Sequence, residues 1–163
     1  ILYPYGPAWS SSYPKEAFLG SWHALLSKAG VSQDRLFVLQ PLPDQSDVRA
    51  VLAQADVYLD SFPYSGATSL LDPLSVGLPP VVMRGDSLRS RQGAAMLSEI
   101  GLDELIAEDR EAYANIVRQL VADEKTRQTM RTKILSRMQH PDFLNSAKFA
   151  ERLMPLLEEL AAE

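Results

Sequence analysis

Short apolar runs alternate along the chain with longer segments in which apolar residues recur every three or four positions. The short runs are bounded by Pro, Gly or polar residues, and they predict strands over residues 1–4, 35–39, 56–60 and 79–83. They are mostly apolar rather than strictly alternating. This pattern is typical of parallel strands that are covered on both faces.

The longer segments predict helices. The first covers residues 15–29 and ends at Gly30, and the next has Ser46 as its expected N-cap. Further helices are expected over residues 68–76, 87–101, 111–123, 124–138 and 146–162, with a bend where the third of these meets the fourth. We therefore expect an α/β fold over residues 1–163: a single Rossmann-like domain with a parallel sheet, helices on both faces, and a helical tail over residues 109–163.

The stretch DVYLDSFPYSGATSLLD, residues 56–72, joins a predicted strand to a predicted helix. Ligands of parallel α/β sheets bind at the carboxyl ends of the strands, and a helix N-terminus there presents backbone N–H groups and a partial positive charge to an anion. Gly66 allows close approach or a positive φ angle, and Thr68 and Ser69 offer hydroxyl groups. The local pattern alone fits an ordinary strand-to-helix turn more simply than a phosphate site.

Pro73 helps to place the start of the helix that follows. Because proline is tolerated best in the first turn, the helix is expected to begin near Thr68 or Ser69, with Asp72 about one turn in. An acidic side chain there can accept hydrogen bonds from ribose hydroxyl groups. Asp60, at the end of the preceding strand, is expected to shape the turn by accepting backbone hydrogen bonds, while Phe62 and Tyr64 line a pocket or cover the core.

Composition narrows the classes of function. The chain is 46% hydrophobic and 23% charged, as in ordinary globular proteins, and its net charge of −5 argues against nucleic acid as a partner. It has no cysteine, no apolar run long enough to span a membrane and no signal-peptide pattern, so we expect a cytoplasmic protein. Its first residue is Ile1 rather than Met, which indicates a fragment of a longer protein.

Metal binding and nucleophilic triads have little support in the sequence. It contains no D-x-D triplet and no G-x-S-x-G motif, and His23 and His140 lie far apart. We expect both histidines to be structural or solvated, and we expect no metal.

The segments DVYLDSFPYSGATSLLDPLSVGLPPVVM and SLRSRQGAAMLSEIGLDELIAEDREAY resemble the C-terminal catalytic half of the O-GlcNAc transferase and SPINDLY glycosyltransferases. The resemblance extends over about residues 34–149. It implies the donor-binding C-terminal domain of a GT-B fold, in which two Rossmann-like domains hold a nucleotide-sugar between them. The N-terminal GT-B domain, and the tetratricopeptide repeats of many members, would then be partners outside this chain.

Site residues carry over from the resemblance one at a time. The loop that holds the donor diphosphate matches Gly66, Ala67, Thr68 and Ser69, and the ribose-binding acid matches Asp72. The loop that contacts the base matches PLPDQSD, with Leu42, Asp44 and Asp47 as its candidate residues. Arg91 and Tyr64 are candidates for supporting the site.

The chain departs from the family pattern at three of these positions. Ala67 replaces a histidine, and Asp44 and Asp47 replace a lysine and a histidine, so the base is open between uracil and guanine. The family also has a strand, a helix and a lysine-bearing region before the segment that residues 1–4 resemble. Either that part of the active site lies outside this sequence, or residues 1–4 themselves take the central place in the sheet.

Two main interpretations follow. The first is the nucleotide-sugar-binding domain of an inverting, metal-independent glycosyltransferase that moves a GlcNAc-like sugar from a UDP- or GDP-sugar to Ser or Thr hydroxyls of a protein, with an unassigned general base. The donor would be a substrate, and no cofactor is expected. The alternative is a degenerate, non-catalytic domain of the same lineage with a binding or assembly role. A third and weaker interpretation is an unrelated flavodoxin-like fold with strand order 2-1-3-4-5.

Overall fold

The computed structural model describes residues 15–162 and divides the chain into two compact units, one ending at Asp47 and one beginning at Val48. In the first unit, helix α1 (Lys15–Lys28) confirms the predicted helix. Gly30 follows it with a φ of 67°, a conformation that favours glycine. The prediction of one domain over residues 1–163 stays a prediction, and each unit is described by itself.

Two predictions in the first unit are wrong. Residues 35–39 do not form a full strand, because within this run only Val38 is paired, as an isolated β-bridge. Gln33–Arg35 form a short 3₁₀ helix, η1, because the Ser32 hydroxyl accepts a hydrogen bond from the Asp34 N–H, and Phe37 is left 62% exposed. Helix α2 (Gln45–Leu52) begins before Ser46, since the Asp47 N–H already donates to the Asp44 carbonyl at 3.1 Å. The strand predicted over residues 1–4 lies outside the described residues.

The second unit contains a parallel sheet. Within the described residues it has three strands in the order β1 (Tyr58–Leu59), β2 (Pro80–Met83) and β3 (Ile106–Ala107). Tyr58 pairs with Pro80, and Val82 with Ile106. β3 was not predicted, because its apolar run, residues 105–107, is bounded by Glu104 and Glu108 and is too short to recognise.

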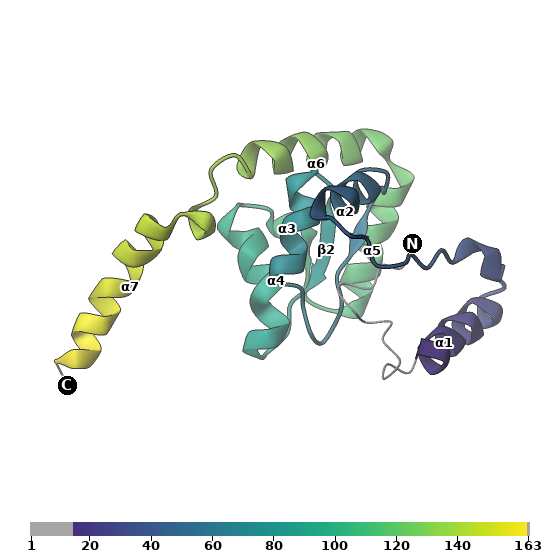
Figure 1. Ribbon diagram of the computed structural model, residues 1–163, viewed down its shortest axis with the longest axis horizontal. Helices are drawn as coiled ribbons and strands as arrows, with labels where there is room; N and C mark the ends of the chain where they lie inside the picture. The colour runs from purple at the N-terminus through teal and green to yellow at the C-terminus, as the bar shows by residue number, and fades with distance from the viewer. Residues whose placement is uncertain (1–14, 163) are drawn as a thin grey trace. The chain divides into compact units, whose positions relative to one another are not determined.

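The predicted helices of the second unit are confirmed. They are α3 (Thr68–Ser75), α4 (Leu88–Glu99), α5 (Arg110–Ala122), α6 (Glu124–Arg137) and α7 (Ser146–Ala161), with short 3₁₀ turns η2 (Asp103–Leu105) and η3 (Asp142–Leu144). The expected bend falls at Asp123, which ends α5 and caps α6 by accepting from the Lys125 and Thr126 N–H groups. α4 and α5 both contact β2, and they lie on either side of the sheet in Figure 1.

The core lies between the sheet and these helices. Its fully buried side chains include residues of α3, β2, α4 and α6: Leu70, Leu74, Val81, Val82, Leu97 and Ile134. Among the described strands, β2 is therefore central both in strand order and in packing.

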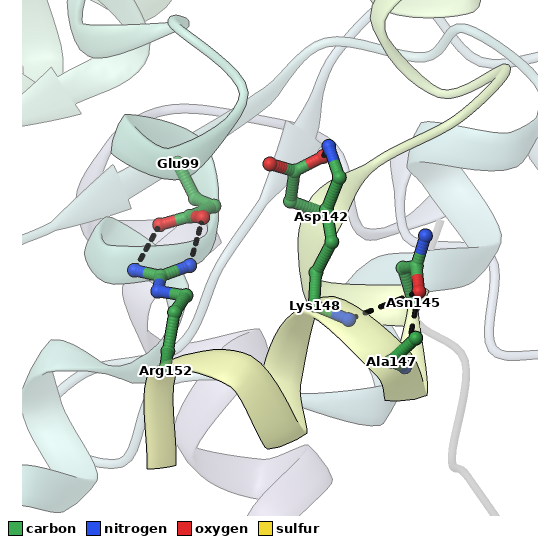
Figure 2. Close-up of polar contacts among 6 residues, drawn as sticks. All are labelled: Glu99, Asp142, Asn145, Ala147, Lys148 and Arg152. Atoms are coloured by element: carbon green, nitrogen blue, oxygen red, sulfur yellow. Dashed lines mark hydrogen bonds and ion pairs between the residues drawn. The ribbon is translucent and has the colours of Figure 1, made fainter. Parts of the chain in front are cut away.

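Helix α7 is attached mainly by polar contacts, and none of its described residues is buried. Figure 2 shows the Arg152 guanidinium facing the Glu99 carboxylate at the end of α4, with Nη1 and Oε1 2.6 Å apart. At its start, Asn145 caps the helix, and the Lys148 ammonium pairs with Asp142 at 2.7 Å. The predicted helical character of the tail is thus confirmed, and the apolar face of α7 is exposed.

Truncating Leu97 should destabilise the fold much more than truncating Leu88 on the same helix. Leu97 is fully buried and Leu88 is 82% exposed. Leu97→Ala should lower the free energy of unfolding by about 2–5 kcal/mol, because it leaves a cavity. Leu88→Ala should change it by less than about 0.5 kcal/mol. Urea denaturation followed by circular dichroism measures both, and equal losses would contradict the packing described above.

Candidate functional site

The candidate site is built on the loop between β1 and α3, and Asp60 organises that loop. Asp60 follows β1 directly, and only 8% of its surface is exposed. One carboxylate oxygen accepts the Gly66 N–H at 2.9 Å, and the other accepts the Ser65 hydroxyl at 2.6 Å. The predicted role of Asp60 in shaping the turn is confirmed. Burial raises the pKa of Asp60, while the hydrogen bonds from Ser65 and Gly66 oppose that rise.

Ser65 ties this loop to α4. Its side chain is fully buried, and its hydroxyl oxygen accepts the Gly93 N–H at 3.0 Å while donating to Asp60. Its own N–H donates to the Arg89 carbonyl at 3.1 Å. Sequence reasoning treated Ser65 as one small turn residue and missed Gly93. The available signal was a glycine inside a predicted helix, where it costs stability unless something packs closely against it.

Two glycines are required by close approach rather than by a left-handed conformation. A Cβ on Gly66 would lie 2.8 Å from the Ser69 hydroxyl oxygen and 2.9 Å from the Asp60 carboxylate. A Cβ on Gly93 would lie 2.4 Å from the Ser65 hydroxyl oxygen. Gly66 is not among the described glycines with a positive φ, so the expectation that it would use that freedom is not met.

The N-terminus of α3 opens at this loop. Ala67 is its N-cap residue and makes no side-chain cap hydrogen bond. The helix begins at Thr68 as expected, but Pro73 lies in its second turn rather than its first. Proline has no N–H, so Pro73 removes one donor from an already short helix. Two features of this arrangement suit an anion. They are the N-terminus of α3, with its partial positive charge, and the exposed hydroxyl of Thr68.

Asp72 lies about one turn into α3 and is 6% exposed. One of its carboxylate oxygens is 3.4 Å from Nε of Arg49, which lies in the last turn of α2. Sequence reasoning did not select Arg49. An Arg in the last turn of a helix is ordinarily read as interacting with the helix dipole, and its partner is 23 residues away in the chain.

The other predicted residues are placed less specifically. Tyr64 and Phe62 are 63% and 44% exposed, so they do not cover the core. Arg91 is exposed in the first turn of α4 and takes no part in the ion pairs found among the described residues.

Comparison with known proteins places the chain in a family. The model of glycosyl transferase family 41 matches residues 9–153. The chain belongs to glycosyl transferase family 41.

Relatives and solved structures agree with this assignment. The chain is 26% identical over 130 residues to a SPINDLY protein of Solanum lycopersicum, described as a UDP-N-acetylglucosamine-peptide N-acetylglucosaminyltransferase, over 80% of this chain and 14% of the relative. It is 38% identical over 80 residues to such a transferase of Caenorhabditis elegans, over 49% of this chain and 7% of the relative. An O-GlcNAc transferase mutant of Thermobaculum terrenum superposes with a TM-score of 0.73 and 30% identity, over 82% of this chain and 26% of that structure.

These comparisons confirm the family resemblance and the Rossmann-like fold, so the flavodoxin-like interpretation is wrong. The family 41 chain spans only 14% of the length of the SPINDLY relative.

The predicted base-contacting loop lies in the unit that ends at Asp47, and it includes Leu42, Asp44 and Asp47. Both aspartates are exposed, and the role of these residues as base contacts stays a prediction. Residues 15–162 contain no cluster of three potential metal ligands and no helix that is long and apolar enough to cross a membrane.

Gly66→Ala should destabilise the family 41 chain, because the new Cβ would collide with Asp60, Ser69 and Leu70. We expect a loss of about 1–3 kcal/mol in the free energy of unfolding. Thr68→Ala, at the exposed first residue of α3, should change it by less than about 0.5 kcal/mol. Urea denaturation compares the two, and a neutral Gly66→Ala would show that the close approach is not required.

Tyr113 should ionise unusually late. Its hydroxyl donates to the Asp60 carbonyl at 3.1 Å, and burial, with the charges of Asp60 and Tyr58, raises its pKa from 10.0 to about 12. Since the pKa is higher in the folded chain, the stabilisation by Tyr113 should be complete below pH 10 and lost as the pH rises towards 12. Unfolding of wild type and Tyr113→Phe across this range measures the difference. A difference that stays constant would contradict the raised pKa.

Proposed function

We propose that this chain is the nucleotide-sugar-binding part of a protein glycosyltransferase of family 41. The N-acetylglucosaminyltransferase names of the relatives support a GlcNAc donor and a peptide acceptor. The acceptor group in this proposal is a Ser or Thr hydroxyl. One observation carries the proposal: in a chain of this family, a helix N-terminus without a side-chain cap opens at the carboxyl end of a parallel strand, beside a buried carboxylate. The activity belongs to a longer protein, of which this chain supplies one part.

The diphosphate of the donor would lie at the first turn of α3. The backbone N–H groups of Ala67 and Thr68 and the Thr68 hydroxyl are the donors that this proposal uses. The N–H of Gly66 already donates to Asp60, so Gly66 would contribute space for the diphosphate rather than a hydrogen bond. The Ser69 hydroxyl remains a predicted member of the same cradle.

The ribose would be held by Asp72. Its carboxylate is nearly buried and is paired with the half-exposed Arg49 side chain. A charged acceptor that is already fixed by one partner is suited to hydrogen bonding vicinal hydroxyl groups, since less orientational freedom is lost on binding.

The reaction would be an inverting displacement without a metal. The acceptor hydroxyl attacks the anomeric carbon, the bond from that carbon to the diphosphate breaks, and the leaving diphosphate gains charge that the α3 N-terminus stabilises. The general base and a further cation would come from the rest of the protein.

A non-catalytic domain of the same lineage is the second candidate. Ala67, Asp44 and Asp47 favour it, because the family pattern has basic or imidazole side chains at these positions, and both aspartates are exposed acids.

The same two aspartates bear on the base of the donor. Two carboxylates in place of basic groups would suit the N–H edge of guanine better than uracil, so a GDP-sugar is the alternative donor.

Asp72→Asn should weaken nucleotide binding by about tenfold or more, because a charged hydrogen-bond acceptor for the ribose is lost. Isothermal titration calorimetry of the 163-residue chain with UDP, GDP and UDP-GlcNAc measures the affinity and identifies the base.

Asp56→Asn is the matched control for this substitution. Asp56 also pairs with an arginine, Arg127, at 3.2 Å, but its side chain is exposed and lies outside the candidate site. Asp56→Asn should bind nucleotide with wild-type affinity. If the wild-type chain shows no saturable binding at millimolar nucleotide, the non-catalytic interpretation is favoured instead.

A further inference from the structure

Ser65 makes an unusual two-point contact with the backbone of α4. In an α-helix, the carbonyl of residue 89 and the N–H of residue 93 are the pair that closes one turn. Ser65 bonds both groups: its N–H donates to the Arg89 carbonyl at 3.1 Å, and its hydroxyl oxygen accepts the Gly93 N–H at 3.0 Å. Ser65 is therefore docked on one specific turn of α4 through its main chain and its side chain.

The same hydroxyl continues into the loop. It donates to Asp60 at 2.6 Å, and the other oxygen of that carboxylate accepts the Gly66 N–H at 2.9 Å. A continuous chain of hydrogen bonds thus runs from Gly93 through Ser65 and Asp60 to Gly66, which is two residues before α3 begins. Three of these four residues are buried, and Gly66 is half-buried.

Helix α3 has little means of fixing its own first turn. It has eight residues, and Pro73 removes one of its backbone donors. Helices of this length are marginal without tertiary contacts. Leu70 in the first turn is fully buried in the core, and the hydrogen-bonded chain that ends at Gly66 holds the loop before it, so the two together position that turn.

We propose that Ser65 and Asp60 are positioning residues for the donor diphosphate: they hold the first turn of α3 against α4 so that its N–H groups are fixed before the ligand arrives. The proposal rests on the proposed function, because it assigns the diphosphate to that turn. Neither residue needs to touch the ligand. The clamp, defined as Asp60, Ser65 and Gly93, acts through Gly66 on the turn that follows.

The test compares the affinities of a nucleoside diphosphate and its monophosphate, UDP with UMP or GDP with GMP according to the base that binds. The clamp positions the turn and not the ribose anchor, so its loss should mainly reduce the gain in affinity that the second phosphate provides. Ser65→Ala should weaken binding of the diphosphate by about tenfold, the effect of about one lost hydrogen bond, and change the monophosphate affinity much less. Titrations are run with the 163-residue chain at a temperature where circular dichroism shows every variant to be folded.

Gly93→Ala tests the clamp from its other side. Its Cβ would lie 2.4 Å from the Ser65 hydroxyl oxygen, so it should separate the loop from α4 and reproduce the selective loss of diphosphate affinity. Ile134→Val is the stability control. Ile134 is a fully buried residue of α6 outside the clamp, and its variant should lower the denaturation midpoint without changing either affinity.

The outcomes separate the two proposals. A wild-type chain that binds neither diphosphate overturns the proposed function and this inference with it. Wild-type binding together with an unchanged ratio of diphosphate to monophosphate affinity in Ser65→Ala and Gly93→Ala overturns this inference alone. An unchanged ratio includes the case in which both affinities fall equally, which would indicate general disruption of the site. If Gly93→Ala fails to fold, Ser65→Ala decides.

Discussion

The buried hydroxyl of Ser65 is the contact on which the candidate site depends. It joins the loop after β1 to the backbone of α4 and, through Asp60, sets the approach to α3. Because its contacts with Asp60 and Gly93 are buried, losing one of them leaves a buried polar group unpaired, which costs more than the hydrogen bond itself contributes. The close contacts of Gly66 and Gly93 follow from the same constraint, since a side chain on either residue would collide with an atom of this network.

The sheet explains why this network lies where a ligand could use it. β2 is central among the described strands, and its neighbours run parallel to it, so the loop after β1 lies at the carboxyl edge of the sheet. Parallel order also brings α4 close enough for Ser65 to dock on it, although the two are more than twenty residues apart in sequence. The core and the site therefore depend on the same residue. Leu70 belongs to the core, and a Cβ on either Gly66 or Gly93 would crowd the Leu70 side chain.

Much of this was predictable from sequence, and the exceptions have physical causes. Long periodic helices such as α5 and α6, and the end of α4 near Gly101, follow from local signals. β3 did not, because a strand of two residues is defined by its pairing with β2 rather than by its own pattern. For residues 35–39 the apolar run overstated the strand, because Arg35 belongs to η1 and only Val38 takes part in an isolated β-bridge. In the site, type and spacing made the loop and Asp72 candidates and the family resemblance selected them, whereas Arg49, Ser65 and Gly93 act through contacts distant in sequence.

Mapping of backbone amide shifts by NMR during titration with a nucleoside diphosphate tests the central claim most directly. The account predicts that the largest shifts fall on Ala67 and Thr68 at the start of α3 and on residues around Asp72, with smaller shifts at Gly66 and Gly93. Saturable binding with its shifts elsewhere, for example on α7, would contradict the assignment of the diphosphate to this turn. So would the absence of any shift at millimolar ligand.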